Sequence, residues 1–186
     1  MSVSVAEVQT VWKEADCLWT AQQVEESITR IAQSISADLV DKNPLVLVVM
    51  KGGMVFGARL LMQLQFPLEL EYVHVSRYGS GLSGGADMLW KVAPPPSLAK
   101  RHVLVVDDIL DEGVTLSAIL QACESQGAKS VKSVVLVDKQ HDRKADADFR
   151  ADYTCLDIPD RYIFGYGMDY KGYLRNADGI FAVKGQ

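Results

Sequence analysis

The chain of 186 residues is poor in cysteine, in long apolar runs and in excess positive charge, and each shortage excludes a class of protein. Its three cysteines, Cys17, Cys123 and Cys155, are far apart and show no CxxC or histidine spacing, which argues against a disulfide framework or a zinc site. We expect buried thiols in a cytoplasmic protein. No apolar stretch has the length of a membrane span and no basic-then-apolar leader opens the chain, so no membrane partner is expected. A net charge of −5 gives no reason to expect a nucleic-acid partner.

Apolar residues make up 48% of the chain, enough to bury a sizeable core. The length of the chain favours one domain covering residues 1–186. Four segments are expected to be strands, and helical patterns follow several of them. One of them, Val103–Val106, is apolar without polar alternation, as expected of a strand buried on both faces of a parallel sheet. We therefore expect an α/β fold with a mainly parallel sheet flanked by helices. The first part of the chain, from Val5 to Leu39, shows helical spacing, and Thr20 is a candidate cap. The four expected strands are Leu45–Met50, Leu68–Val75, Val103–Val106 and Val131–Val137.

The third of these runs ends in two acids and a glycine turn before a new apolar segment. Asp107 and Asp108 lie at the strand's carboxyl end, and the loop Asp111–Thr115 leads into a helix, whose first N–H groups and dipole favour an anion. Acids beside a phosphate would repel it unless they bind hydroxyls or a divalent cation, so the pattern predicts a sugar phosphate with Mg²⁺. The alternative is that the acids only cap structure, with Asp111 as the helix N-cap.

Two further loops follow expected strands. Lys51 and Gly52 begin a strand-to-helix turn in which a ligand could approach the backbone closely, although a plain tight turn explains the glycines equally well. Residues 77–97 begin with Arg77 and Tyr78, are rich in glycine and serine, and end in three prolines. We interpret them as a mobile lid, the alternative being a linker. His141 lies among charges and is interpreted as a solvated loop residue.

The segment from Val103 to Leu120 resembles the phosphoribosyl pyrophosphate-binding motif of the type I phosphoribosyltransferases, with Glu112 where a small Thr or Ser is usual and Val114 where a polar residue is common. The runs DKQHDRK and IPDRYIFGYGMDYKGYLRN narrow the resemblance to the hypoxanthine-guanine phosphoribosyltransferases, and it covers the chain from about Leu45 to Asn176. It implies the type I fold, with a small hood formed by the C-terminal aromatic segment and the N-terminus.

In that family, some of the matching residues bind the purine base and others bind phosphoribosyl pyrophosphate. The resemblance implies that Asp111 is the general base and that Tyr78 belongs to the closing lid. Lys139 would bind the exocyclic oxygen of the purine, Tyr162 would stack on the base, Ile163 would use its backbone carbonyl, and Asp169 beside them would help hold the metal. Phosphoribosyl pyrophosphate would be bound by Lys51, Gly52, Asp107, Asp108, Asp111, Glu112, Gly113, Val114, Thr115 and Arg175, and Mg²⁺ by Asp107, Asp108 and Asp169.

The implied activity is purine salvage, in which hypoxanthine or guanine receives the phosphoribosyl group and pyrophosphate leaves. Two alternatives stay open: an enzyme of the same fold for xanthine or adenine, and a non-catalytic nucleotide-binding regulator. Small molecules are the expected partners, and the resemblance also implies a homodimer or homotetramer.

Overall fold

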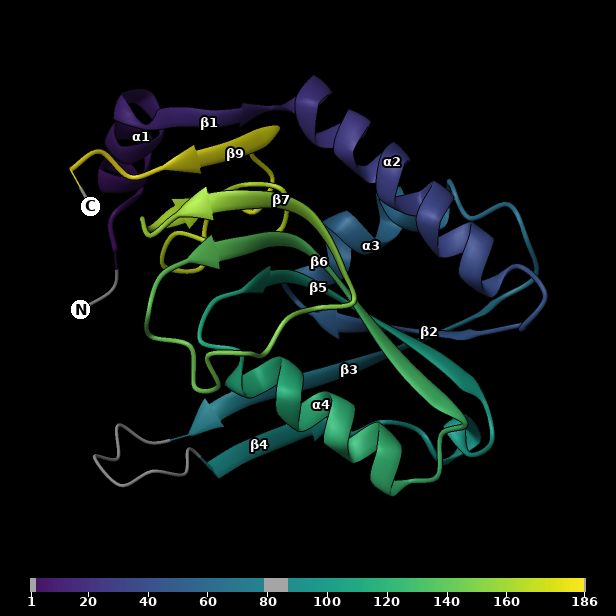
Figure 1. Ribbon diagram of the computed structural model, residues 1–186. Helices are drawn as coiled ribbons and strands as arrows, with labels where there is room; N and C mark the ends of the chain where they lie inside the picture. The colour runs from purple at the N-terminus through teal and green to yellow at the C-terminus, as the bar shows by residue number, and fades with distance from the viewer. Residues whose placement is uncertain (1–2, 79–86, 186) are drawn as a thin grey trace.

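The computed structural model describes residues 3–78 and 87–185, apart from the side chains of Arg77, Tyr78 and Asp87. Its centre is a six-stranded sheet in which all strands are parallel except the edge strand β4 (Figure 1). In spatial order the strands are β4 (Asp87–Val92), β3 (Glu69–Tyr78), β2 (Leu45–Met50), β5 (His102–Leu110), β6 (Ser130–Gln140) and β7 (Tyr153–Pro159). The expected fold class is confirmed.

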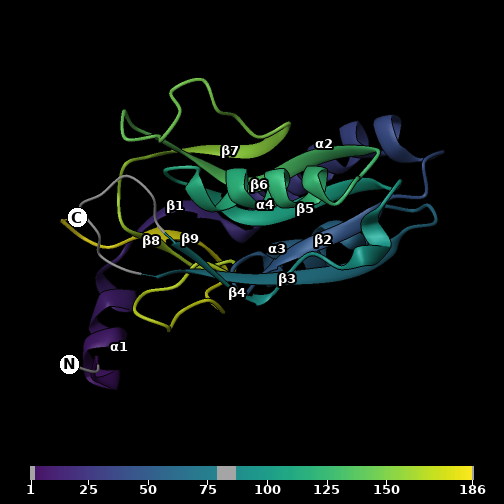
Figure 2. The ribbon, with the colours of Figure 1, turned by 90° about the horizontal axis from the view of Figure 1, so that it is seen from below.

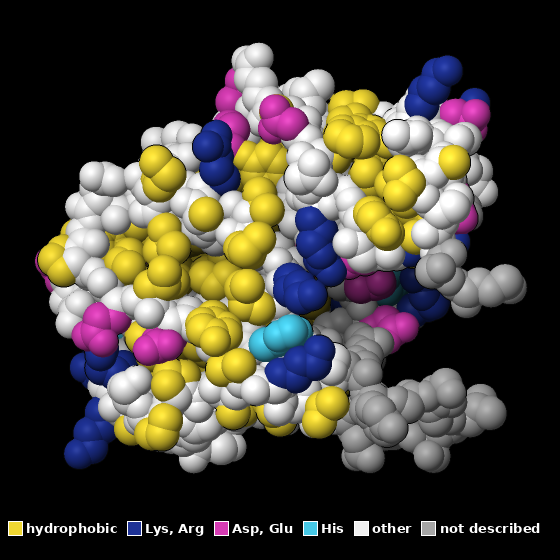
Figure 3. All heavy atoms as spheres, turned by 180° about the vertical axis from the view of Figure 1, so that it is seen from behind, with side chains coloured by type: hydrophobic (Ala, Val, Ile, Leu, Met, Phe, Trp, Pro, Cys, Tyr) yellow, Lys and Arg dark blue, Asp and Glu magenta, His cyan; other side chains and the backbone are white. Residues whose placement is uncertain are grey.

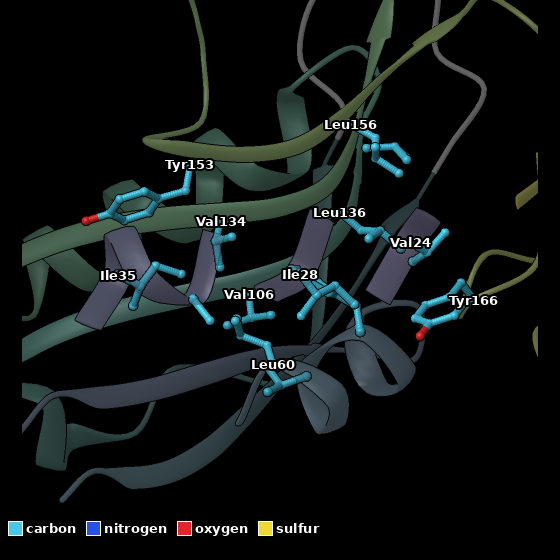
Figure 4. Close-up of a cluster of buried hydrophobic side chains, with 14 of the residues drawn as sticks. Val24, Ile28, Ile35, Leu60, Val106, Val134, Leu136, Tyr153, Leu156 and Tyr166 are labelled. Atoms are coloured by element: carbon cyan, nitrogen blue, oxygen red, sulfur yellow. The ribbon is translucent and has the colours of Figure 1, made fainter. Parts of the chain in front are cut away.

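Helices cover both faces of this sheet, which explains why its central strands are apolar on both sides. Helices α2 (Ala21–Leu39) and α3 (Gly53–Leu61) pack on one face, and α4 (Val114–Ser125) packs on the other (Figures 1 and 2). Successive residues of a strand point to opposite faces. Accordingly, Val106 joins the core under α2 and α3 (Figure 4), whereas Val105 joins the core under α4.

The helical pattern expected from Val5 to Leu39 is interrupted, so that expectation is wrong in part. Helix α1 (Val5–Glu14) ends before β1 (Asp16–Thr20), and α2 begins only after it. Strand β1 pairs with β9 (Gly179–Ala182), which also pairs with β8 (Ile163–Phe164). Pairing with a strand from the far end of the chain thus overrides the local helical pattern. The predicted cap is confirmed, because Thr20 and Gln23 form a reciprocal capping box at the start of α2.

The small sheet β1-β9-β8 packs with α1 around its own apolar cluster and forms the predicted hood (Figure 2). Two expectations need correction here. Cys17 is exposed because it lies in the short strand β1, so it is not a buried thiol. The predicted lid also contains regular structure: β4 pairs antiparallel with β3, and the short 3₁₀ helix Pro96–Leu98 follows. Residues 79–86 and the side chain of Tyr78 lie outside the described part of the chain, so the lid stays a prediction.

Candidate active site

A cavity of about 270 Å³ lies beyond the carboxyl ends of β2 and β5, where ligands bind in open parallel sheets. Its lining comes from four separate parts of the chain, which are the turn after β2, the end of β5, the start of α4 and Arg175. The cavity brings together nine of the ten residues predicted to bind phosphoribosyl pyrophosphate: Lys51, Gly52, Asp107, Asp108, Asp111, Glu112, Gly113, Thr115 and Arg175. The tenth, Val114, instead lines a neighbouring hollow beside α4.

The acid pair on β5 is buried and closely packed. Asp107 and Asp108 are 7% and 8% exposed, and the Asp107 Oδ1 accepts a hydrogen bond of 2.9 Å from the Asp108 backbone N–H. Burial, reinforced by the charge of Asp108, raises the pKa of Asp107 well above its usual range, and burial also raises the pKa of Asp108. Two adjacent buried carboxyl groups are therefore stabilised in the ionised form only when hydroxyl donors or a cation reach them.

The third predicted metal ligand lies elsewhere. Asp169 accepts a hydrogen bond from the Gly172 N–H and forms an ion pair with Arg175, which also donates to the Gly167 carbonyl at 2.6 Å. Among residues 3–78 and 87–185, no three acidic, histidine or cysteine side chains gather into a metal-binding cluster. Mg²⁺ usually takes only one or two protein carboxylates and completes its shell with water and phosphate. The acid pair fits that role. Asp169 forms its ion pair with Arg175, and its part in holding the metal stays a prediction.

The helix that follows the acidic loop begins without a side-chain cap. Gly113 is the N-cap of α4, with a φ of 83°, and makes no side-chain cap hydrogen bond. Asp111 is thus not the N-cap, so the capping alternative for this residue is wrong. Gly113 and Thr115 at this helix start line the cavity, and the N–H groups of a helix start suit a phosphate. The peptide bond between Met50 and Lys51, on the opposite wall, is cis.

Asp111 is bound on both of its carboxylate oxygens. Oδ2 lies 3.2 Å from the Lys139 Nζ at the end of β6, and Oδ1 lies 2.6 Å from the His141 Nε2. Partial burial raises the pKa of Asp111, but the His141 hydrogen bond and the Lys139 charge outweigh it and hold that pKa below its ordinary value. The interpretation of His141 as a solvated residue is wrong, because its side chain is only 4% exposed.

Two more residues of this cluster escaped prediction. The Arg143 guanidinium pairs with both carboxylate oxygens of Asp160 and lowers the pKa of that carboxyl to about 2. Asp160 also lies 3.8 Å from the Lys139 Nζ. One signal was present in the sequence: residues two apart in an extended segment point the same way, so His141 was placed to share the side occupied by Lys139.

The predicted base-binding residues lie in the segment that follows Asp160. Tyr162 is 42% exposed, and its ring lies edge-on to that of Tyr170 with centroids 5.6 Å apart. Ile163 is buried in β8, where it pairs with Ala182. Asp160, two residues before Tyr162, lies 3.8 Å from the Lys139 Nζ, so the segment that carries Tyr162 begins beside Lys139.

Comparisons with known proteins agree with this arrangement. Residues 15–171 match the phosphoribosyl transferase domain family. The hypoxanthine-guanine phosphoribosyltransferase of Bacillus subtilis strain 168 is 30% identical over 167 residues, which cover 90% of this chain and 92% of that protein.

Two solved structures are similar over nearly their whole length. The hypoxanthine phosphoribosyltransferase of Staphylococcus aureus has a TM-score of 0.86 and 28% identity, and the match covers 97% of each chain. That of Trypanosoma cruzi, in complex with the product IMP, has a TM-score of 0.83 and 31% identity over 92% of this chain and 95% of that one. None of the helices in the described residues is long and apolar enough to cross a membrane.

Proposed function

The chain belongs to the phosphoribosyl transferase domain family, and from that premise we propose that its site transfers the phosphoribosyl group of phosphoribosyl pyrophosphate to hypoxanthine or guanine. The products are IMP or GMP and pyrophosphate, which makes the reaction a step of purine salvage. The 3.2 Å contact between Lys139 and Asp111 carries the proposal, because it joins a donor suited to a 6-oxopurine to the cavity suited to a sugar phosphate.

The proposed phosphoribosyl half of the site uses donors on both cavity walls. The uncapped start of α4 holds the 5′-phosphate through its backbone N–H groups. Asp107 and Asp108 accept hydrogen bonds from the ribose hydroxyls, and these donors offset the cost of burying two carboxylates. Lys51 and Arg175, which lie in the same cavity, bind the pyrophosphate. Arg175 is already oriented for this by Asp169 and the Gly167 carbonyl.

The proposed base half lies at the ends of β6 and β8. Lys139 carries only donors, so it suits the exocyclic oxygen of a 6-oxopurine and not the amino group of adenine. Tyr162 offers an exposed ring for stacking, and the backbone of Ile163 supplies a carbonyl. Asp111 accepts the proton of the purine ring nitrogen, which its lowered pKa permits because the carboxylate is ionised at neutral pH.

Mg²⁺ is the proposed cofactor, held by Asp107 and Asp108 together with the substrate. When bound, it would neutralise the charge of the departing pyrophosphate. Positive charge develops on the ribose ring as the bond to pyrophosphate breaks, and the buried carboxylates nearby stabilise it. Lys51 and Arg175 stabilise the negative charge that develops on the leaving group.

The direct test supplies the purified protein with phosphoribosyl pyrophosphate, Mg²⁺ and one free base at a time, and identifies the product by mass. We expect products from hypoxanthine and guanine and none from adenine. If the protein converted xanthine or adenine in preference to hypoxanthine and guanine, the proposed base would be wrong. Binding of nucleotide without turnover of any base would favour a regulator of the same fold.

We propose that a second copy of the chain covers an apolar face beside the site, giving a homodimer or homotetramer. Leu70 and Tyr72 of β3 and Leu89 of β4 are about half exposed and point to the same face of the sheet, next to the exposed Met54 and Met62 of α3. Figure 3 shows hydrophobic side chains gathered into a continuous patch on the back of the molecule. A patch of this kind is typical of an interface between subunits.

Light scattering coupled to size exclusion tests this proposal. Leu70→Glu with Tyr72→Glu should yield a monomer, whereas Val40→Glu, at an exposed apolar residue on another side, should leave the assembly intact. A monomeric wild-type protein would contradict it.

We also propose a cytoplasmic location, which the three cysteines support because they are not paired in disulfides.

A further inference from the structure

His141 stands out because it is a buried histidine in a loop otherwise occupied by charged residues. Its ring is 4% exposed, and both of its nitrogens have partners. Nδ1 accepts a hydrogen bond of 2.9 Å from the backbone N–H of Arg143, and Nε2 lies 2.6 Å from the Asp111 Oδ1. A backbone N–H can only donate, so Nδ1 carries no proton. The proton of the ring is therefore on Nε2 and is donated to Asp111.

The charged groups around this hydrogen bond define what each oxygen of Asp111 can do. Lys139 lies at Oδ2, Arg143 approaches Oδ1 at 3.9 Å, and Asp160 is held by Arg143 and faces Lys139. Lys139 is also the residue assigned to the 6-oxo group of the base. The ammonium has three donors and Oδ2 has a second lone pair, so Oδ2 can receive a proton while Lys139 donates to that group. The His141 bond to Oδ1 involves no substrate atom and persists.

We propose that His141 is a positioning residue that holds the Asp111 carboxylate by Oδ1 and leaves Oδ2 to receive the ring proton of the purine. The inference rests on the function proposed above. In the step itself the N–H bond of the purine breaks and an O–H bond forms at Oδ2. The electron pair left on the purine nitrogen forms the new bond to the anomeric carbon, and the bond from that carbon to pyrophosphate breaks, its electron pair leaving on the pyrophosphate oxygen. His141 neither gains nor loses a proton. It fixes the direction in which the accepting lone pair points.

The loop that carries His141 is itself anchored, which gives the histidine a fixed position. Lys144, only 7% exposed in its side chain, forms a buried ion pair with Asp138, the residue before Lys139. The Ala145 N–H also donates to the Glu112 carbonyl at 2.9 Å, so the loop is bonded to the turn that carries Asp111. A backbone-anchored ring that is bonded to the proton acceptor is the arrangement expected of a residue that orients it.

Steady-state kinetics of His141→Leu and His141→Gln test the proposal. The Gln side chain places an N–H donor near the position of the histidine Nε2, whereas Leu supplies none. We expect His141→Leu to lower kcat by about 10- to 100-fold, the loss expected for one hydrogen bond to a charged group, with both KM values changed less than about threefold. His141→Gln should recover most of the rate. His102→Leu is the matched control, since His102 bonds Ser130 at the opposite end of the sheet.

The pH profile gives a readout that a packing role would not move. The His141 hydrogen bond lowers the pKa of Asp111, so its loss raises that pKa and protonates the carboxylate at a higher pH. The acid limb of kcat should therefore shift to higher pH in His141→Leu and stay near its wild-type position in His141→Gln and His102→Leu.

A double-mutant cycle separates this role from a general loss of structure. If His141 acts through Asp111, His141→Leu has no further effect on kcat in an Asp111→Asn background. An equal loss in both backgrounds, an unchanged kcat in His141→Leu, or a change confined to KM would overturn the inference while leaving the proposed function in place. A wild-type protein that converts no base would overturn the function and this inference together.

Discussion

Gly52 lies directly against the carboxylate of Asp108: a β-carbon built on Gly52 would stand 2.0 Å from the Asp108 Oδ2. Real β-carbons essentially never approach another atom this closely, so the turn after β2 and the end of β5 fit together only with glycine at this position. The acid pair and the turn at Lys51 and Gly52 therefore fit together as one unit, although they come from different strands.

Gly52→Ala should weaken the binding of phosphoribosyl pyrophosphate by about 5- to 150-fold, because the added methyl group displaces the Asp108 carboxylate or the turn at an overpacking cost of about 1–3 kcal/mol. Isothermal titration calorimetry measures the affinity. Gly57→Ala is a matched control in α3, the helix that Gly52 precedes as N-cap; its new β-carbon would lie 3.1 Å from a Val48 methyl group, and Gly57 does not line the cavity. Wild-type affinity in Gly52→Ala would contradict the close fit.

Asp111→Asn should lower turnover by roughly 10²–10⁴-fold, the contribution typical of a general base, with little change in affinity for phosphoribosyl pyrophosphate. Asp107→Asn should show the opposite pattern, with weaker binding of phosphoribosyl pyrophosphate and Mg²⁺, because Asp107 lies in the buried acid pair. Pre-steady-state rates and calorimetry distinguish the two. Near-wild-type turnover in Asp111→Asn would exclude it as the base.

Lys139→Ala should damage the use of hypoxanthine and guanine, since the remaining site offers no ammonium donor to the 6-oxo group. The wild-type protein should reject adenine by about 10⁴–10⁵-fold, as sites built on a specific hydrogen bond do. Competition assays with paired bases measure this ratio, and Lys129→Ala, at an exposed lysine, serves as the control. An unchanged rate with hypoxanthine in Lys139→Ala would show that a group other than Lys139 binds the 6-oxo group of the base.

One thiol of three should react rapidly with a disulfide reagent at pH 8. Burial raises the pKa of Cys123 to about 11 and that of Cys155 to about 12, so roughly one thiolate in a thousand or fewer forms there at pH 8. Cys17 is exposed in β1. The slow reaction of Cys123 and Cys155 should accelerate as the pH rises, because more of each thiol is ionised as the pH approaches its pKa. Cys17→Ser should abolish the rapid phase, and rapid reaction of two or more thiols would contradict the burial.

The elements that were predicted from the sequence are those whose signal is local. The apolar run Leu45–Met50 coincides with β2, because a strand buried on both faces needs no polar alternation. The Thr20 cap depends only on a neighbour three residues away. Strands β1 and β9 were not predicted because each is short and is fixed by the other, which lies at the far end of the chain. Strand β7 was not predicted because it is partly exposed at the edge of the sheet.

The candidate site also has parts that local sequence predicted and parts that depend on contacts between distant residues. The loop from Asp111 to Thr115 combines acids, a glycine and a helix start within a few residues, so its cavity was predictable. The bond between His141 and Asp111 joins residues 30 positions apart and depends on how the loop after β6 folds back. The acidic residue at 160 likewise gave no signal, because its partner Arg143 meets it only in three dimensions.

The pairing of β1 with β9 has a consequence for synthesis. The ribosome makes β1 before and β9 after all the strands of the large sheet, in which β2, β3, β5, β6 and β7 are parallel. A nascent chain can thus assemble its large sheet while β1 still lacks its partner, and the hood is completed only after Ala182 has left the ribosome. Synthesis interrupted before that residue yields a protein with the acid pair in place and an unpaired strand edge exposed to other chains.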